Sequence, residues 1–291
     1  MDIAYLGPVA SFTHSAAQYA FPDENLVPLG TIPDAIMAIQ RGEVDAAVVP
    51  IENTIEGGVN TTLDYLFHFA DVPIQAEIVL PIAQHVMVHP QNEAVWKSVQ
   101  KVLSHPQGLA QCAKFLHEHL YGVEQIATPS TAYAAKWVKE HPDELAAAIA
   151  PDLAAAQYGL KTVQANAQDI ELNQTRFAVL SRKKPKLALP AEEEKTSISV
   201  ILPNNLPGAL HKVLSAFAWR NIDLSKIESR PLKTSLGEYF FLIDLYSSEK
   251  TELVKNALSE INLLGGETKV LGTYHVFRIL KKHRRGLNQC E

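Results

Sequence analysis

The strongest constraint on the fold is the alternation of short apolar segments with segments whose apolar residues recur at helical spacing. Residues 45–50 and 146–150 are apolar enough to form buried strands, whereas residues 32–39 place their apolar side chains on one helical face. Strands that alternate with helices predict a parallel or mixed sheet with helices on both faces. We therefore expect an α/β fold for this part of the chain.

Two connections in this region, one before Pro81 and one near Asp169, suggest that the chain crosses twice between two α/β lobes. We expect one lobe to contain residues 1–78 together with 160–182, and the other to contain residues 79–159. A cleft between two lobes is the usual place for a ligand.

The remaining sequence has a different pattern. Residues 183–195 are charged and contain proline without an amphipathic period, which is typical of a linker. Residues 196–281 predict the order strand, helix, strand, strand, helix, strand of a ferredoxin-like (βαββαβ) domain. The basic end of the chain, residues 282–291, is expected to be a solvated tail.

Charge and composition exclude several classes of protein. The net charge of -6 and the isoelectric point near 6.0 argue against a general nucleic-acid binder. No apolar run is long enough for a membrane span, and no secretory signal is visible at the start. Cys112 and Cys290 do not suggest a disulfide framework, so we expect a cytoplasmic protein.

The sequence lacks the motifs of metal sites, phosphate-binding loops and serine nucleophiles. His117 and His119 are two residues apart on a predicted helix and point to different faces, which argues against a metal site. No glycine-rich phosphate loop follows a strand, and no serine lies in a nucleophile elbow. His105 is compatible either with a general acid or base or with a structural hydrogen-bonding group.

The most promising stretch for chemistry is Leu172–Leu180, which runs from polar residues into an apolar, β-prone segment. Thr175 and Arg176 are expected where a loop enters a strand. Their hydroxyl and guanidinium can donate hydrogen bonds to a departing oxygen and clamp a carboxylate. An edge strand with a surface arginine is the alternative.

Two further positions suggest ligand binding. Asn53 lies in a polar loop after a buried strand, where its amide can orient a hydroxyl or carboxylate or simply shape the turn. Ser11 or Thr13 is expected to cap a helix whose free N–H groups favour a bound carboxylate or phosphate. Ordinary capping explains these two residues equally well.

Several ordered motifs together resemble one family. They include Asn-Gln-Thr-Arg-Phe at residues 173–177, Pro-Ile-Glu-Asn-Thr at 50–54 and Thr-Pro-Ser-Thr-Ala at 128–132. The other matching segments are residues 5–8, 11–12, 58–59, 104–107, 111–112, 207–210 and 227–231. The chain resembles the monofunctional bacterial prephenate dehydratases, whose C-terminal part is an ACT regulatory domain.

The resemblance implies a two-lobed, periplasmic-binding-protein-like catalytic domain over residues 1–182 and an ACT domain over residues 196–281. It also implies that prephenate is decarboxylated and dehydrated to phenylpyruvate without a cofactor or metal. In this comparison Thr175 matches the catalytic threonine, and Arg176 and Asn53 complete the catalytic set. The expected substrate-binding residues are Ser11, Glu52, Thr54, Ser104, Gln111 and Phe177.

The chain departs from the family pattern in its first loop. Where the family usually has Gly-Thr, this chain has Ala10 and Ser11, and where it usually has Ser the chain has Thr54. Ser11 and Thr54 keep a hydroxyl, but Ala10 restricts the positive φ that glycine allows.

The ACT resemblance implies feedback control by L-phenylalanine and a homodimer or homotetramer. The residues expected to line the effector site are Pro207, Gly208, Ala209, Leu210, Glu228, Ser229 and Arg230. A fixed dimerisation module without regulation is the alternative.

Two other functions are compatible with the same fold. A two-lobed amino-acid or carboxylate sensor would bind its ligand without catalysis, and an arogenate dehydratase would prefer the aminated substrate.

Overall fold

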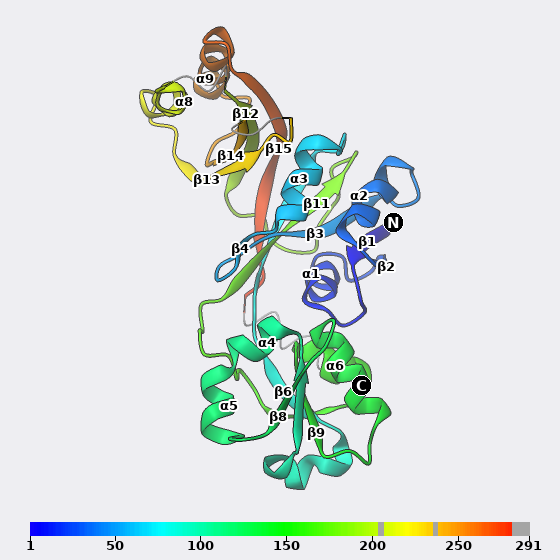
Figure 1. Ribbon diagram of the computed structural model, residues 1–291. Coiled ribbons are helices and arrows are strands. Elements are labelled where there is room, and N and C mark those ends of the chain that lie inside the picture. Colours follow the sequence, from blue (N-terminus) through cyan, green and yellow to red (C-terminus); the bar gives the residue numbers. More distant parts are fainter. Residues whose placement is uncertain (203–206, 235–237, 281–291) are drawn as a thin grey trace.

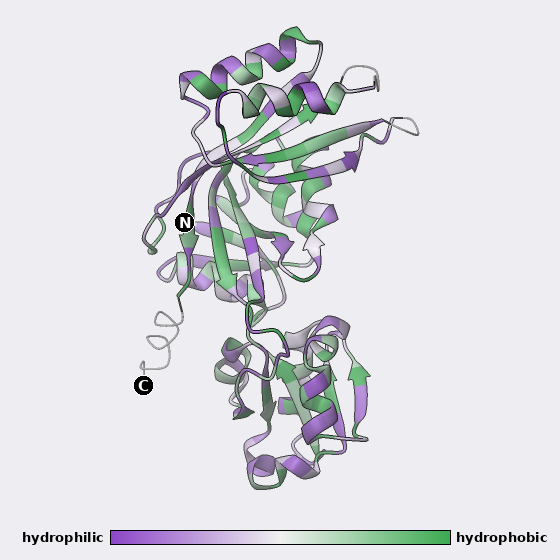
Figure 2. Cartoon of the chain, turned by 90° about the vertical axis from the view of Figure 1, so that its left-hand side faces the viewer, coloured by the Kyte–Doolittle hydropathy of each residue, from purple (hydrophilic) through white to green (hydrophobic). Residues whose placement is uncertain are grey.

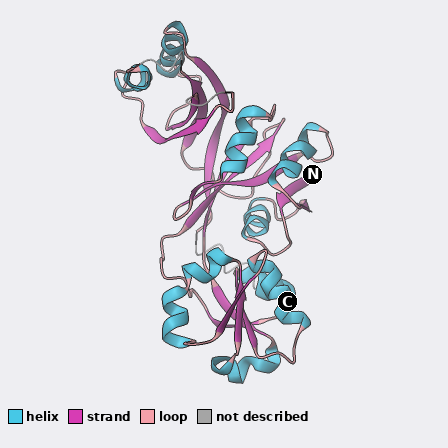
Figure 3. Ribbon diagram, in the orientation of Figure 1, coloured by secondary structure: helices cyan, strands magenta, loops and turns pink. Residues whose placement is uncertain are grey.

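The computed structural model describes residues 1–202, 207–234 and 238–280, which form three units arranged in a row (Figure 1). We call them the first lobe, the second lobe and the C-terminal domain. The first lobe lies between the other two, and each unit combines strands with covering helices (Figure 3).

The elements of the first lobe are β1 (Asp2–Leu6), α1 (Phe12–Ala20), β2 (Asn25–Leu29), α2 (Ile32–Gln40), β3 (Ala46–Asn53), β4 (Gly57–Gly58), α3 (Asn60–His68), β5 (Ile74–Pro81) and β11 (Gln174–Ser181). The elements of the second lobe are β6 (His85–Val88), η1 (Pro90–Ser98), β7 (Lys101–Ser104), α4 (Pro106–Gln111), α5 (Ala113–His119), β8 (Glu124–Ala127), α6 (Thr131–Glu140), β9 (Ala146–Ala150), α7 (Asp152–Tyr158) and β10 (Lys161–Gln164). The C-terminal domain consists of β12 (Glu194–Ile201), α8 (Ala209–Ala218), β13 (Leu224–Pro231), β14 (Tyr239–Leu245), α9 (Glu252–Leu263) and β15 (Glu267–Arg278).

The α/β architecture and the βαββαβ order of the C-terminal domain are confirmed, but two details of the second lobe differ from the expectation. The strand Lys161–Gln164 pairs with β6 in the second sheet, so it does not lie with the first lobe as expected. The apolar pattern of residues 108–119 predicts one helix, but the structure interrupts it at Cys112, whose φ of -116° and ψ of 18° are not helical. The fully buried Cys112 side chain remains in the core of the second lobe.

The C-terminal domain and the first lobe share one continuous sheet. Its strand order is β13-β14-β12-β15-β5-β11-β3-β1-β2, and β15 joins β5 in parallel from His275 opposite Ala76 to Arg278 opposite Val79. In Figure 1 the long strand β15 runs from the C-terminal domain into the first lobe. The expected linker also packs against this lobe, since Leu189 is buried and Ala188 N donates to Ala20 O at 2.9 Å. The two units therefore form one structural body.

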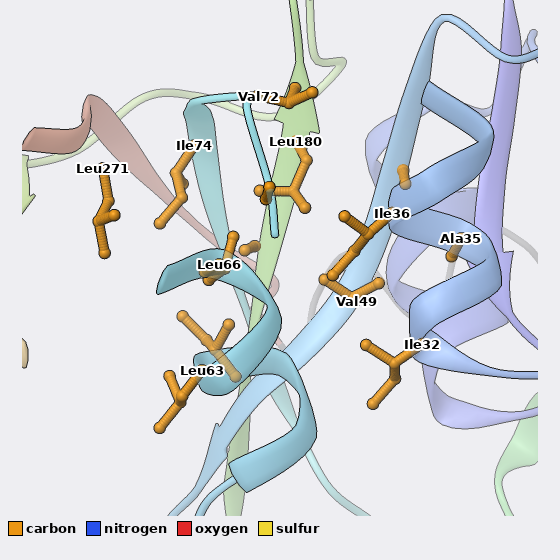
Figure 4. Close-up of a cluster of buried hydrophobic side chains, with 14 of the residues drawn as sticks. Ile32, Ala35, Ile36, Val49, Leu63, Leu66, Val72, Ile74, Leu180 and Leu271 are labelled. Carbon is orange, nitrogen blue, oxygen red and sulfur yellow. The ribbon is translucent and has the colours of Figure 1, made fainter. Parts of the chain in front are cut away.

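A common hydrophobic core reinforces this connection. Leu63 and Leu66 of α3 belong to the same buried cluster as Leu271 of β15, and Figure 4 shows part of this cluster. The ring of Phe67 stacks on Phe240 of β14, with centroids 3.6 Å apart. The central strands of the sheet are correspondingly hydrophobic in Figure 2. Within the described ranges, no helix combines the length and the apolar character that crossing a membrane requires.

The close approach of β15 to the first lobe depends on Gly272, and this yields a stability prediction. A Cβ at Gly272 would lie 2.2 Å from the backbone oxygen of Ile74, so the Gly272→Ala variant must push β15 away from its neighbour. We expect its free energy of unfolding to fall by about 1–3 kcal/mol in chemical denaturation.

Gly30→Ala is the matched control, because no atom lies within 4 Å of a Cβ built there. It should change stability by no more than about 0.5 kcal/mol. Equal stability of the two variants would contradict the proposed packing constraint.

Candidate functional site

A cavity of about 570 Å³ lies between the two lobes, and we call it the interlobe cavity. Both lobes contribute strand ends, loops and the first turns of helices to its walls. Its lining residues are Leu6, Gly7, Pro8, Ser11, Phe12, Thr13, Pro50, Asn53, Glu56, Gly57, Gly58, Val59, Ile82, Gln84, His105, Gln107, Gly108, Gln111, Pro129, Ser130, Thr131 and Thr175.

The first turns of α1, α4 and α6 line this cavity, α1 from the first lobe and the other two from the second. Ser11 caps α1 by accepting a hydrogen bond from His14 N at 3.2 Å, and Ser130 caps α6 by accepting from Tyr133 N at 3.0 Å. Helix N-termini carry partial positive charge and unpaired N–H groups, which favour anions. The cavity therefore has anion-binding groups on both walls, and of the two caps expected from the sequence, Ser11 and Thr13, the structure uses Ser11.

Thr175 and Asn53 meet at the floor of the cavity. They are opposite one another in the antiparallel pair β11–β3, and Asn53 Nδ2 donates to Thr175 Oγ1 at 2.9 Å. The Asn53 amide is itself fixed, because Nδ2 also donates to Asn173 Oδ1 at 2.8 Å and Oδ1 accepts from Ile55 N at 3.0 Å. Since Asn53 supplies a donor to Thr175 Oγ1, the Thr175 hydroxyl hydrogen can be donated to a ligand.

The cavity brings together Asn53, Thr175, Ser11 and Gln111 from the predicted set. His105 also lines it, but its Nδ1 accepts from Gln107 N at 3.3 Å as the cap of α4, in agreement with the structural interpretation.

Sequence reasoning missed two groups that line the cavity. Gln84 was not singled out, although it follows the crossing at Pro81 directly; its Nε2 donates to Gln111 Oε1 at 3.1 Å. Ser130 and Thr131 belong to the family motif at residues 128–132 but were not predicted to bind substrate, since their contribution to the cavity depends on how the lobes face each other.

The prediction that Arg176 shares the cavity with Thr175 and Asn53 is wrong. Successive residues of a strand point to opposite faces, so a Thr175 side chain in the cavity directs Arg176 to the other side of the sheet. There Arg176 Nη1 lies 2.5 Å from Glu52 Oε2, and Nη2 lies 2.5 Å from Glu77 Oε2 and 2.7 Å from Asp244 Oδ2. Glu52 precedes Asn53 in β3 and faces the same side as Arg176, so the prediction that it binds substrate in the cavity is also wrong.

Three other predicted substrate residues lie outside the interlobe cavity. Ser104 is fully buried and donates to Ile149 O at 2.7 Å, and Phe177 is buried in the core of the first lobe. Thr54 exchanges hydrogen bonds with the Gln174 backbone, accepting from its N at 3.0 Å and donating to its O at 2.9 Å. These side chains support the cavity walls and do not line them.

The expected effector residues are divided between two places. Gly208, with φ of +81°, precedes α8, and Pro207 is exposed beside it. In β13, Glu228 and Arg230 face the first lobe, where Arg230 Nη2 lies 2.9 Å from Asp64 Oδ1, whereas Ser229 is exposed on the other face. Within one chain these residues therefore do not all face the same space.

Burial and charge act in opposite directions on Arg176. Burial alone would lower the pKa of its guanidinium, but the carboxylates of Asp244 and Glu77 outweigh this effect and raise the pKa above its ordinary value. Burial also raises the pKa of the Cys112 thiol to about 12, which makes it a poor nucleophile. Across the part of the chain that the structure describes, no group of three or more His, Cys, Asp or Glu is arranged to hold a metal ion.

His14 supports the loop at the entrance of α1. Its Nδ1 accepts a hydrogen bond from Ala10 N at 2.9 Å, and its ring stacks on Tyr5 with centroids 4.8 Å apart. Ala10 has a φ of +65°, so this buried residue adopts the conformation that glycine favours. Burial lowers the pKa of His14 below its ordinary value of 6.5, because the charged ring would lose its solvation.

Comparison with known proteins agrees with this organisation. The family model for prephenate dehydratase matches residues 3–185, and the model for the ACT domain matches residues 196–262. A prephenate dehydratase of Bacillus subtilis is 45% identical over 288 residues, covering 96% of this chain and 100% of that protein.

Two solved structures have a similar fold. One is a prephenate dehydratase of Arthrobacter aurescens in complex with L-Phe, with a TM-score of 0.83, 34% identity and coverage of 94% of this chain and 90% of that chain. The other is described as a novel type of quorum-quenching acylase, with a TM-score of 0.81, 25% identity and coverage of 95% and 98%.

The environment of His14 predicts a pH dependence of stability. The unfolded chain takes up a proton at the ordinary pKa of about 6.5, whereas the folded chain does so only at lower pH. The contribution of His14 is therefore complete above about pH 6.5 and decreases as the pH falls towards the folded pKa. We expect His14→Gln, which removes this titration, to flatten the loss of stability on acidification from about pH 7 to 5.

Thermal or chemical unfolding at a series of pH values measures this effect. The control is His117→Gln on the exposed face of α5, which should leave the slope unchanged. An unchanged slope in His14→Gln would show that this ring does not titrate as expected.

Proposed function

Because this chain belongs to the prephenate dehydratase family, we propose that the interlobe cavity binds prephenate and is the place of its conversion. The reaction produces phenylpyruvate, water and CO2 in the biosynthesis of L-phenylalanine. The observation that carries the assignment of the site is the Thr175 hydroxyl, oriented by Asn53 at 2.9 Å and facing a cavity lined by helix N-termini.

The chemistry of prephenate defines what the site must supply. The substrate is a non-aromatic ring with two carboxylates and a hydroxyl opposite the carboxylate that leaves as CO2. The electron pair of the breaking C–C bond moves into the ring and expels the hydroxyl oxygen, which leaves as water after gaining a proton. Aromatisation provides the driving force, so the main need is a hydrogen-bond donor at the departing oxygen. No external electron acceptor enters this balance, and we expect turnover to need neither cofactor nor metal.

We assign the donor role to Thr175. Its hydroxyl receives a hydrogen bond from Asn53 and can direct its own hydrogen towards the departing oxygen. A threonine hydroxyl is a weak acid, so its contribution is stabilisation of the developing charge by a hydrogen bond rather than full proton transfer. Asn53 keeps the hydroxyl in this orientation.

The two substrate carboxylates suit the positive helix ends on the two walls. We propose that one carboxylate meets the first turn of α1 at Ser11, and that the other meets the first turns of α4 and α6 at Gln107 and Thr131. Gln111, the last residue of α4, is proposed to bind the substrate through its side-chain amide. Ser104, Thr54 and Phe177 support these walls from behind. The alternative function as a sensor without catalysis has no need of the donor geometry at Thr175.

We propose that L-phenylalanine is the effector and acts at the C-terminal domain, in line with the L-Phe complex of the Arthrobacter relative. The residues proposed for this site remain Pro207 to Leu210 and Glu228 to Arg230. Because these segments do not face one space within one chain, a second copy is proposed to complete the site. A homodimer or homotetramer in the cytoplasm fits this proposal.

Thr175→Ala should reduce turnover of prephenate by about 10²–10⁴-fold, because it removes the donor without changing the fold. The measurement is formation of phenylpyruvate, with circular dichroism to verify folding. Thr175→Ser keeps the hydroxyl and is the control, and it should lose about tenfold or less.

Near-normal turnover of Thr175→Ala would exclude this residue as the donor. If the unmodified protein binds prephenate in calorimetry but forms no product, the sensor alternative is favoured instead. A higher rate with arogenate than with prephenate would favour an arogenate dehydratase.

A further inference from the structure

On the face of β11 that points away from the interlobe cavity, six charged side chains form one cluster between the first lobe and the C-terminal domain. We call Glu52, Glu77, Arg176, Lys195, Lys226 and Asp244 the junction cluster. Each member from the first lobe has a partner from the C-terminal domain. Arg176 Nη2 lies 2.7 Å from Asp244 Oδ2, Glu77 Oε1 lies 3.2 Å from Lys195 Nζ, and Glu52 Oε1 lies 3.2 Å from Lys226 Nζ.

Most of the cluster is shielded from water, although the Glu52 side chain is 27% exposed and four members line a pocket of about 380 Å³. The side chain of Glu77 is 0% exposed, that of Lys195 5%, that of Asp244 11% and that of Arg176 16%. Removing one partner from a buried ion pair leaves an uncompensated charge, which is strongly unfavourable. The cluster therefore ties the position of the C-terminal domain to that of the first lobe.

Arg176 connects this cluster to the catalytic groups because it directly follows Thr175 in the chain. Two neighbouring positions of the β11–β3 ladder pair Thr175 with Asn53 and Arg176 with Glu52. The first pair is joined by a hydrogen bond of 2.9 Å on the cavity side, and the second by an ion pair of 2.5 Å on the opposite side. A displacement of Arg176 along its strand is therefore passed directly to the Thr175 backbone.

Asp244 is held by the internal packing of the C-terminal domain. Its Oδ1 accepts from Ser197 Oγ at 2.5 Å, and Ser197 Oγ lies 2.6 Å from Tyr274 Oη. Ser197 is on β12 and Tyr274 on β15, the strand that joins β5. A rearrangement within this domain thus alters a partner of Arg176 that belongs to the C-terminal domain, whereas Glu52 and Glu77 belong to the first lobe together with Arg176.

We propose that Arg176 is a positioning residue that keeps Thr175 and Asn53 in register, and that its contact with Asp244 transmits the state of the C-terminal domain to them. The second half of this proposal rests on the regulation by L-phenylalanine proposed above. An effector changes activity only if it favours one arrangement over another. Here the differing contact is the Arg176–Asp244 pair.

Asp244→Asn tests the transmission. The amide keeps the shape of the side chain and can still accept from Ser197, but it loses the charge that attracts Arg176. Glu52 and Glu77 still compensate the buried charge of Arg176, so we expect kcat without effector to stay within about threefold. The factor by which L-phenylalanine and prephenate alter each other's affinity, typically about 5–150 in allosteric proteins, should fall to about 1–3. Calorimetry should find L-phenylalanine binding itself unchanged within about threefold.

Glu260→Gln is the matched control within the C-terminal domain. It removes an ion pair of 2.7 Å with Arg220, in which both partners belong to the C-terminal domain and the side chains are 22% and 29% exposed. This variant should keep the response to L-phenylalanine. If both variants lose it equally, the response follows the stability of the domain and the proposed transmission is overturned.

Arg176→Lys tests the positioning role. Lysine keeps the charge but lacks the planar guanidinium that binds three carboxylates at once. Thr175 should therefore shift relative to Asn53. We expect kcat to fall about tenfold or more with little change in KM, because a small misplacement affects the chemical step most. The active fraction is measured from the stoichiometry of L-phenylalanine binding. A kcat within about twofold of the unmodified protein would overturn the positioning role.

The outcomes separate the proposals. No turnover by the unmodified protein contradicts the proposed activity before any variant is made. Turnover without a response to L-phenylalanine contradicts both the proposed regulation and the transmission by Asp244. A normal response in Asp244→Asn overturns the transmission alone. If Arg176→Lys does not fold, Glu52→Gln is measured instead. Glu52 is opposite Arg176 in the β11–β3 ladder and next to Asn53, so its loss, unlike that of Asp244, should lower kcat in the same way. An unchanged kcat there overturns the positioning role.

Discussion

The organisation of the molecule depends on the alternation of side chains along β11. This strand lies between β3 and β5 in the middle of the shared sheet. Thr175 points into the interlobe cavity, and Arg176, the next residue, points to the junction cluster. A single dipeptide therefore has a side chain in the cavity and a side chain in the contact with the C-terminal domain.

The continuous sheet makes this contact strong. Backbone pairing of β15 with β5, the stacked rings of Phe67 and Phe240, and the buried charges around Arg176 all join the same two units. Each type of contact has a different sensitivity: hydrophobic packing tolerates small shifts, whereas a buried ion pair requires its partner at a defined position. A regulatory change is therefore expressed most sharply in the charged contacts.

Much of the fold follows from local sequence patterns. The strand at Ala146–Ala150, the helix that begins at Ile32 and a helix cap at Ser11 or Thr13 were predicted from periodicity and capping residues, because these features depend on neighbours in the chain. The assignment of residues 161–164 to the second lobe was not predicted, since their strand pairing with β6 is a contact between distant segments. The break at Cys112 was also missed, because its apolar neighbours continue the helical pattern.

The sequence by itself determined which residue types are available for chemistry, and it placed Thr175 and Asn53 at the ends of two apolar strands. Alternation along a strand also implies that Thr175 and Arg176 face opposite sides, but it does not say which side is the cavity. Only the tertiary structure decided this, because the second lobe covers one face of β11 at Thr175 and the C-terminal domain covers the other at Arg176. The physical reason is that a side chain's role depends on what packs against it, and those partners come from segments far away in the chain.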